Sequence, residues 1–163
     1  MKVKKEFGGS LLKGRRKSAR PLSSKHPIHL VLHSKIVLRA GGFLRHQKFV
    51  RQVLGRVARR WGINIYDLAV VRDHIHASIR IPNRVAYRNF IQSVTGTIAL
   101  ELNPSPIKCE FWDVRPFTRV VEWGAAFRKL RAYIEMNVLE ACGAIPYQPR
   151  GRGSSSMRTW TPS

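Results

Sequence analysis

A pair of histidines separated by one apolar residue is the feature of this sequence that most clearly suggests chemistry. His74 and His76 flank Ile75 in a run of apolar and β-branched residues that predicts a strand. Alternate side chains of a strand share a face, so the two imidazoles would project together while Ile75 points into the core. Neutral imidazoles are common ligands of divalent metals. The spacing alone is a weak signal, and two solvated or hydrogen-bonded histidines on an open sheet face are the alternative.

A tyrosine and an asparagine one helical turn apart form a second candidate group. Tyr133 and Asn137 are spaced i, i+4 within a predicted helix and therefore share one of its faces. A phenol, whose pKa is about 10, can attack phosphorus when a base, a metal or basic neighbours activate it. The Asn137 carbonyl could serve as a third metal ligand. The plainer alternative is a tyrosine at the border of the apolar stripe that hydrogen-bonds its neighbour.

The charge of the chain points to a polyanionic partner. Its 163 residues include 30 Lys and Arg against 9 Asp and Glu, a net charge of +21. Such a balance is most often found in proteins that bind nucleic acid. The few acids show no clustered spacing, so we expect histidine rather than carboxylates to carry any metal chemistry. A structural protein of the ribosomal type would share this composition.

Two sets of basic residues are candidates for phosphate contacts. Nine Lys and Arg lie within residues 1–25, and others lie on the outer face of the first predicted helix. Because phosphate contacts position a protein without reading bases, no individual base reader is assigned. The predicted DNA-binding residues are Lys13, Arg15, Arg16, Lys17 and Arg20 in the N-terminal arm, and Lys48 and Arg51 on the helix.

The cysteines and the apolar segments of the sequence bear on the cellular compartment. The two cysteines, Cys109 and Cys142, lack the spacing of a zinc site. The basic N-terminus lacks the apolar segment of a signal peptide, and no apolar run approaches the roughly 18 residues of a membrane helix. We therefore expect a cytoplasmic protein without membrane contact.

Hydrophobic periodicity and breaker residues predict seven elements. Strands are expected at 28–37, 63–71, 74–81 and 111–121, the last interrupted at Pro116. Helices are expected at 46–61, at 84–102 after an Asn83 cap, and at 125–142 before Gly143. Arg72 and Asp73 would connect the second and third strands as a hairpin.

The order of these elements predicts an α+β fold. Strand, helix, strand, strand, helix, strand is the β-α-β-β-α-β pattern of ferredoxin-like domains, with one antiparallel sheet, helices on one face and here an extra C-terminal helix. The opposite sheet face would be free for a ligand, a metal or another subunit. We expect a flexible basic arm at 1–25, a catalytic domain at 26–143 and a flexible tail at 144–163.

The two motifs together resemble a known family. The His74-Ile75-His76 strand and the helix segment 133–137 (Tyr-Ile-Glu-Met-Asn) resemble the single-tyrosine HUH transposases of bacterial insertion sequences, including the REP-associated tyrosine transposases. The order of elements matches over about residues 26–143, and the arm segment 14–21 is similar too. Relatives often have Pro where this chain has Val138, and a Pro-Asn turn where it has Arg72-Asp73.

The resemblance implies a mechanism and its participants. His74, His76 and Asn137 would hold Mg²⁺ or Mn²⁺ against a scissile phosphate, and Tyr133 would become joined to the DNA 5′ end and free a 3′ hydroxyl. The substrate would be single-stranded or hairpin DNA, the protein a homodimer, and its location the nucleoid of a bacterial cytoplasm. A non-catalytic, domesticated nucleic-acid-binding module on the same fold is the alternative function.

Overall fold

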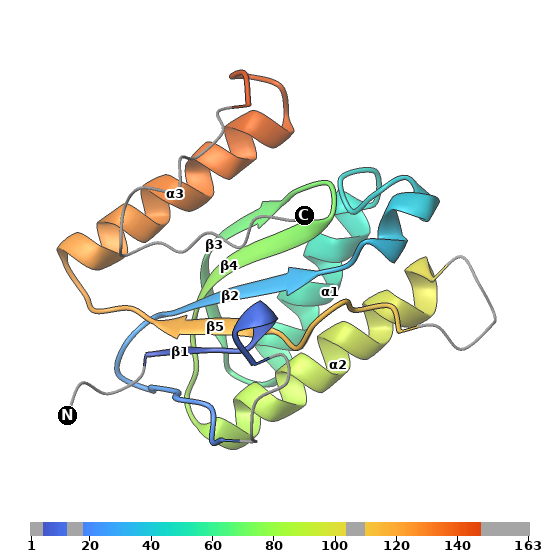
Figure 1. Cartoon of the computed structure of the whole chain (residues 1–163). Helices are drawn as coiled ribbons and strands as arrows, with labels where there is room; N and C mark the ends of the chain where they lie inside the picture. The colour runs from blue at the N-terminus through green and yellow to red at the C-terminus, as the bar shows by residue number, and fades with distance from the viewer. Residues whose placement is uncertain (1–4, 13–17, 104–109, 148–163) are drawn as a thin grey trace.

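The computed structural model describes residues 5–12, 18–103 and 110–147, which form one antiparallel sheet with helices packed against it (Figure 1). The strands are β1 (Glu6–Phe7), β2 (Ile28–His33), β3 (Asn64–Val70), β4 (His74–Arg80) and β5 (Phe117–Val120). The α-helices are α1 (Gln47–Arg60), α2 (Arg84–Leu102) and α3 (Ala125–Ala141), and two 3₁₀ turns are η1 (Gly9–Leu12) and η2 (Ile36–Ala40).

The strand order confirms the predicted fold class. The five strands lie in the order β1-β5-β2-β4-β3, and every neighbouring pair is antiparallel. From β2 onward, the chain follows the β-α-β-β-α-β pattern before α3. The central strands are β2 and β4, so the histidines of both strands lie in the middle of the sheet.

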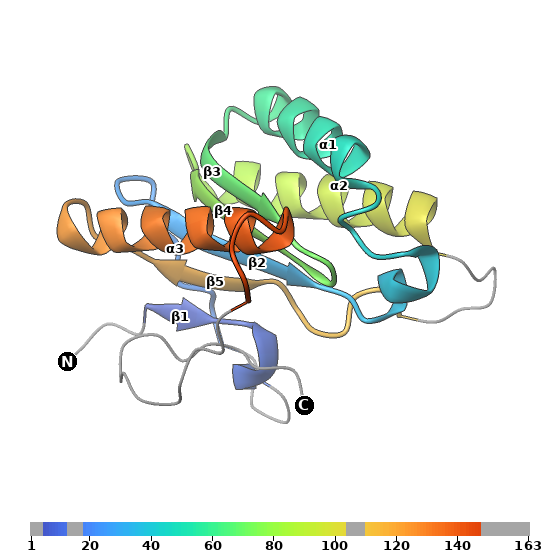
Figure 2. The same cartoon turned by 90° about the horizontal axis from the view of Figure 1, so that it is seen from above.

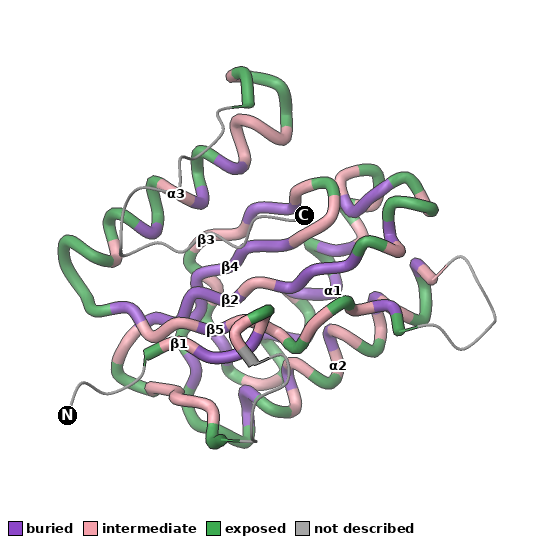
Figure 3. The backbone as a smooth tube through the Cα atoms, viewed as in Figure 1, coloured by how far each residue is buried: buried purple, intermediate pink, exposed green. Residues whose placement is uncertain are grey.

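The main core lies between the sheet and the paired helices α1 and α2. Ile28, Leu30 and Leu32 of β2 point into it, together with Ile75, Ala77 and Ile79 of β4. This strict alternation is the period of a strand with one face buried against helices. Figure 2 shows α1 and α2 together on one side of the sheet, and the tube in Figure 3 shows the central strands largely buried.

Local signals explain where the long helix α2 begins. Pro82 precedes it, and the side chain of Asn83 accepts a hydrogen bond of 2.8 Å from the Ala86 backbone N–H. This bond satisfies one of the amides that lack a partner in the first turn of any helix. The predicted helix at 84–102 is confirmed.

Helix α3 packs on the sheet face opposite α1 and α2. Its buried Leu130 and Ile134 form a small second core with Ala69 of β3 and with Val121. Ala69 alternates with Val70, which belongs to the main core, so the two cores lie on opposite faces. Figure 1 shows α3 running past β3, apart from the other two helices. The face expected to be free is therefore partly covered by this helix.

Two predicted strands were too long. The strand expected at 28–37 ends at His33, because the Ser34 hydroxyl donates to the Phe111 carbonyl and accepts from Val37 N–H, which starts η2. The strand expected at 111–121 is confined to Phe117–Val120. Its predicted first residue, Phe111, is buried in the main core beside Phe43 instead of pairing in the sheet.

The N-terminal segment contains a strand that the sequence pattern did not indicate. Glu6 and Phe7 pair with Arg119 and Thr118 and extend the sheet at the β5 edge. Part of the arm expected to be flexible is therefore ordered against the sheet. Residues 13–17 of the arm and 148–163 of the expected tail lie outside the described residues. Within the described part of the chain, no helix has the length and apolar character needed to cross a membrane.

Candidate functional site

Four histidines meet on the sheet face that α3 covers. The register pairs His33 with His74, Val31 with His76 and His29 with Ser78, so the alternate residues of both central strands share this face. The rings of His74 and His76 lie edge to face with centroids 4.6 Å apart. The prediction that the His74 and His76 side chains project together, away from the buried Ile75, is confirmed.

The structure also brings in two histidines that the sequence did not assign to the site. His29 and His33 lie on this face of β2, and both are buried, with 7% and 3% of their surface exposed. His29 Nε2 lies 3.2 Å from His76 Nδ1. Burial, together with the nearby Arg119 charge, lowers the pKa of His29 to about 3, so it is neutral at physiological pH.

Tyr133 lies directly beside this cluster. Its ring centroid is 5.4 Å from that of His76 and 5.9 Å from that of His29, and both contacts are edge-on. Leu130 and Ile134 anchor α3 on the sheet, and the 3.6-residue period then turns Tyr133 toward the histidines. Residues from distant parts of the chain, predicted as nucleophile and metal ligands, are thus brought together.

Asn137 has the burial and the bonding expected of a residue that faces the sheet. Only 4% of its surface is exposed, and its Nδ2 donates a 2.7 Å hydrogen bond to the Tyr133 carbonyl. That bond uses the amide nitrogen and orients the group, whose carbonyl oxygen is the atom able to bind a metal. Across residues 5–12, 18–103 and 110–147, no three His, Cys, Asp or Glu side chains form a metal site.

The donor set fits a divalent cation such as Mg²⁺ or Mn²⁺. Two neighbouring imidazoles on one sheet face and a buried amide oxygen supply N and O donors that Mn²⁺ accepts, and Mg²⁺ favours oxygen donors. A cation held by three protein groups keeps positions open for a phosphate oxygen and water. The residues that would hold it are His74, His76 and Asn137.

A chain of carboxylates and imidazoles extends from His74 to the edge of the site. Asp73 Oδ1 lies 2.6 Å from His74 Nδ1, and Asp73 Oδ2 lies 3.2 Å from His33 Nε2. His33 Nδ1 in turn contacts Asp113 Oδ2. Burial alone would raise the pKa of Asp73, but hydrogen bonds from His33 and His74 outweigh it and hold that pKa well below its usual range. In the sequence, only its position next to His74 could have identified Asp73 as part of this chain. No sequence feature pointed to Asp113.

A second polar link joins α3 to the sheet near the histidines. The Ser78 hydroxyl, fully buried on the same face of β4, donates 2.6 Å to Asp67 Oδ2, and Arg131 Nε of α3 donates 3.0 Å to Asp67 Oδ1. Asp67 therefore holds a residue of α3 close to Tyr133 in sequence. This link and the small second core together position the helix that carries Tyr133.

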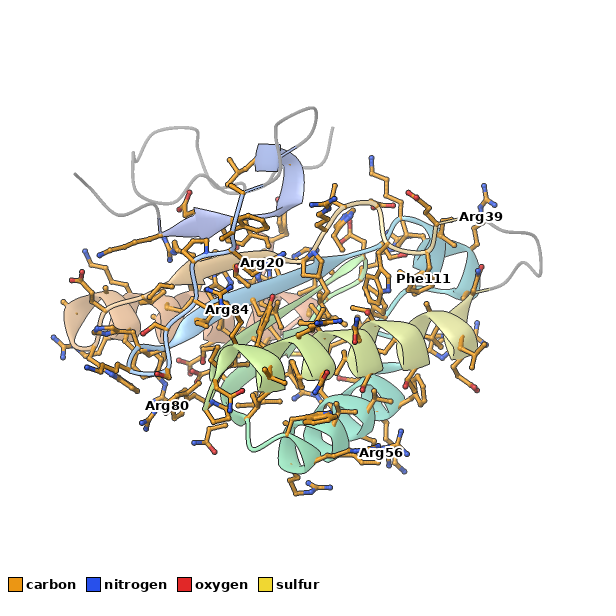
Figure 4. The ribbon with its side chains drawn as sticks, turned by 90° about the horizontal axis from the view of Figure 1, so that it is seen from below. Arg20, Arg39, Arg56, Arg80, Arg84 and Phe111 are labelled. Carbon is orange, nitrogen blue, oxygen red and sulfur yellow. The ribbon has the colours of Figure 1, made fainter. Side chains whose placement is uncertain are left out.

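The predicted DNA-binding residues are dispersed. Lys48 and Arg51 are exposed on α1, on the far side of the sheet from Tyr133, and Arg51 Nη2 reaches the Leu68 carbonyl of β3 at 3.4 Å. Figure 4 shows Arg56 on the same helix, together with Arg20 and Arg84 near the start of α2. Lys13, Arg15, Arg16 and Lys17 lie outside the described residues.

Arg20 makes contacts within the protein. Its Nη1 donates 2.7 Å hydrogen bonds to the Pro116 carbonyl and to Thr118 Oγ1, and its guanidinium lies 4.3 Å from the centre of the Phe7 ring. Arg84 Nη1 donates to the Arg20 carbonyl at 3.0 Å. Arg20 therefore fastens the N-terminal segment to β5, a role that the sequence prediction of a DNA contact had not considered.

Comparison with known proteins identifies the family of the chain. The family model described as "Transposase IS200 like" matches residues 23–137, which include the histidine pair, Tyr133 and Asn137. Among curated proteins, none matches the chain.

Two solved structures match the chain. One is a REP-associated tyrosine transposase bound to a REP hairpin, with a TM-score of 0.54 at 14% identity over 77% of this chain and 73% of that one. The other is a candidate transposase from Deinococcus radiodurans R1, with a TM-score of 0.46 at 18% identity over 75% and 98% of the respective chains. The family match covers well over half of the sequence and confirms the resemblance that the two motifs predicted. The chain belongs to the IS200-like transposase family.

Proposed function

We propose that this transposase cleaves and rejoins single-stranded or hairpin DNA through a covalent 5′-phosphotyrosine intermediate at Tyr133. The observation that carries the proposal is the 5.4 Å approach of the Tyr133 ring to His76, one of two adjacent histidines able to hold a cation. Membership in a transposase family supplies the DNA-cleaving class of reaction. The solved relative bound to a REP hairpin supports DNA as the partner.

Tyr133 would act as the nucleophile. Its hydroxyl oxygen bonds to phosphorus and loses its proton, the bond from phosphorus to the 3′ oxygen breaks, and that oxygen leaves as a protonated 3′ hydroxyl. Because the phosphotyrosine retains the energy of the phosphodiester, attack by a second 3′ hydroxyl rejoins strands without an external energy source. His74, His76 and Asn137 would hold the divalent cation, which when bound neutralises charge on the phosphoryl oxygens.

The phosphate-binding surface would be assembled from separate regions. Lys48 and Arg51 project from the exposed side of α1, where Arg56, Arg59 and Arg60 add further positive charge. We include these residues, with the basic segment 13–17, as sequence-independent contacts to the DNA backbone. Since α1 and Tyr133 lie on opposite faces of the sheet, DNA that touches both must pass around an edge of the sheet.

The decisive test is formation of a covalent adduct. The wild-type chain with Mn²⁺ and labelled hairpin oligonucleotides from the DNA flanking its gene should give a shifted band on a denaturing gel. Tyr133→Phe should abolish that band and keep DNA binding in a native gel. Tyr66→Phe, at an exposed tyrosine of β3, is the matched control and should retain the adduct.

The metal role has its own test. His74→Ala and His76→Ala should each lose Mn²⁺-dependent adduct formation while binding DNA as the wild type does. Full adduct formation by Tyr133→Phe would overturn the nucleophile assignment. Firm binding with no adduct from the wild type, in any metal and with DNA from both ends of the gene, would favour the non-catalytic binding module.

We also propose that the chain acts as a homodimer, as the resemblance to the family suggests. A monomer has a mass of 18.7 kDa, so light scattering coupled to size-exclusion chromatography should give about twice that value. A mass of one chain at the concentrations used for cleavage would contradict the proposal.

A further inference from the structure

Three aromatic side chains form a cluster at the N-terminal end of α3. Tyr66 of β3, Trp123 just before the helix and Phe127 in its first turn have ring centroids 4.9–5.8 Å apart, and all three contacts are edge to face. Phe127 contacts the small second core, but 44% of Trp123 and 37% of Tyr66 are exposed. The cluster therefore presents an aromatic surface to solvent on the side of the sheet that carries Tyr133.

A β-bulge turns Tyr66 toward this cluster. The register pairs Ile65 with Ile79 and Asp67 with Ser78, so Tyr66 is an extra residue between two consecutive pairs. Asp67 lies on the α3 face, and strict alternation would place Tyr66 on the other face. Its ring instead contacts the first turn of α3. Bulges of this kind redirect side chains and are common beside functional sites.

The indole of Trp123 is both exposed and held in one orientation. Its Nε1 donates a 2.8 Å hydrogen bond to the Lys25 carbonyl, and the rings of Tyr66 and Phe127 support it through edge-to-face contacts. A ring that is fixed in advance loses little conformational entropy when another flat group stacks on it. Nucleobases are such groups, and proteins commonly bind unpaired nucleotides by stacking them on aromatic side chains.

The first half of α3 supplies cations for the phosphates of such a strand. Arg128, Lys129 and Arg131 lie within four consecutive positions, and all three are exposed. Among the described residues, Arg131 is paired with Asp67, whereas Arg128 and Lys129 form no ion pair. Lys129 precedes Tyr133 by four positions and so lies on the same side of the helix. Since α3 has no acid in its first turn and no base in its last, stabilisation of the helix dipole does not explain these charges.

The cluster lies within a few nucleotides of the proposed nucleophile. Phe127 and Tyr133 both contact the small second core and are six positions apart in α3. At about 1.5 Å per residue the separation is about 9 Å along the helix axis, the length of about two or three nucleotides at about 3.4 Å each. Glu122, the acid next to Trp123, forms an ion pair with Lys5 and so repels a phosphate less than a lone carboxylate would.

We infer that Trp123 stacks on an unpaired base of the DNA strand, about two or three nucleotides from the phosphate that Tyr133 attacks. The two aromatic neighbours of the indole support it, and Arg128 and Lys129 contact the intervening phosphates. The inference rests on the proposed function for its substrate and deepens it by naming a binding subsite. Because Tyr66 acts through its ring and not its hydroxyl, Tyr66→Phe keeps this subsite.

The first experiment measures binding without cleavage, by fluorescence anisotropy of labelled DNA in the presence of a chelator. A hairpin with a single-stranded extension is compared with the same hairpin without it. Trp123→Ala should weaken binding to the extended hairpin by about 5- to 150-fold, the usual effect of losing one stacked base, and leave binding to the other unchanged. Trp123→Phe should retain most of the affinity. Leu100→Ala, at an 88% exposed leucine of α2, is the matched control and should bind both as the wild type does.

The salt dependence of binding separates stacking from phosphate contact. Each phosphate contact to a single strand contributes about 0.7 to the slope of log affinity against log salt, so Arg128→Gln and Lys129→Gln should each lower the slope by about that amount. Trp123→Ala should lower the affinity at every salt concentration and leave the slope unchanged. Wild-type slopes in both cation variants would overturn the assigned phosphate contacts.

A second experiment locates the stacked base. Abasic sites placed one at a time along the extension should weaken binding of the wild type most at one position, about two or three nucleotides from the phosphate to which the adduct maps. At that position the abasic site should add nothing in Trp123→Ala, because the base and the indole contribute the same contact. Equal losses in the wild type and in Trp123→Ala at every position would overturn the inference.

The outcomes separate this inference from the proposed function. Adduct formation by the wild type, together with wild-type binding by Trp123→Ala, would overturn the stacking subsite and leave the nucleophile assignment intact. Coupling between Trp123 and one base in a wild type that forms no adduct would support the subsite and count against cleavage. A lower mass of Trp123→Ala in light scattering, with DNA affinity unchanged, would assign the aromatic surface to contact with a second copy and overturn the inference. Near-ultraviolet circular dichroism of the Arg128 and Lys129 variants and far-ultraviolet spectra of all variants, unchanged from the wild type, would show that a loss of affinity is not a loss of fold.

Discussion

Truncation of Leu130 should detach α3 from an otherwise intact protein. Leu130 is fully buried in the small second core, which it shares with Ala69, Val121 and Ile134. The main core between the sheet, α1 and α2 does not include it. Leu130→Ala should therefore mainly weaken the packing of α3 on the sheet and should destabilise the rest of the fold much less.

The size of the effect follows from the atoms removed. Leu→Ala deletes three buried carbon groups at about 0.8 kcal/mol each, and the cavity left behind brings the total to about 2.5–4 kcal/mol. Since about 1.4 kcal/mol is a factor of ten, the opening equilibrium of α3 should rise by about 10²- to 10³-fold. Gly124, with φ of 87°, forms the backbone turn before the helix, and we expect α3 to open from there as a unit.

Hydrogen exchange followed by mass spectrometry tests this reasoning. Peptides from α3 should lose protection by that factor, or reach the unprotected rate first, while peptides from β2 and β4 change little. Leu54→Ala, an equally buried leucine of α1 in the main core, is the matched control and should lower protection throughout the protein. Equal loss of protection in α3 and in the central strands of Leu130→Ala would refute the view that α3 is a separable unit.

Three further predictions concern stability. Asn83→Ala, which removes the bond to Ala86 N–H, should cost about 1 kcal/mol in urea unfolding, and an unchanged midpoint would contradict the cap. Burial raises the pKa of Tyr87 to about 12, so the phenol stays neutral in the folded state after it ionises in the unfolded chain. Stability should thus fall by about 1.4 kcal/mol per pH unit from pH 10 to 12, and the difference between wild type and Tyr87→Phe in unfolding titrations measures this component. Gly42→Ala should destabilise by at least about 1 kcal/mol, because φ is 84° and the new Cβ would lie 2.7 Å from the Arg72 carbonyl. Gly96→Ala, with open space at the Cβ in α2, should instead stabilise by about 0.5–1 kcal/mol; equal thermal shifts in the two variants would contradict the argument.

Sequence patterns were sufficient where the determining interactions are local. The start of α2 follows from Pro82 and Asn83, and the face of His74 and His76 follows from strand alternation around a buried Ile75. The spacing of Tyr133 and Asn137 likewise needs only the helical period. These local rules located the residues of the candidate site on the correct elements.

Sequence patterns failed where contacts with a distant segment determine the structure. Strand β2 ends at His33 because Ser34 bonds Phe111, which lies 77 positions later in the chain. His29 joined the site only through the β2–β4 register, and no local pattern encodes which residues of two strands lie opposite each other. Arg20 lies in a basic segment of the kind that binds phosphate, but its side chain bonds to residues at β5. The two-residue strand β1 pairs with β5 and brings the N-terminal segment there.

The pairing of β1 with β5 also sets the order in which the sheet can be completed during synthesis. Glu6 and Phe7 lie opposite Arg119 and Thr118, so among the described residues the first strand along the chain pairs with the last. At about 5–20 residues per second, the N-terminal segment waits about 6–22 s before its partner has been synthesised. The β3–β4 hairpin, by contrast, can form as soon as residue 80 has emerged from the ribosome. The pairing of β1 with β5 therefore forms late in synthesis, at about the time that α3, the helix that carries Tyr133, is made.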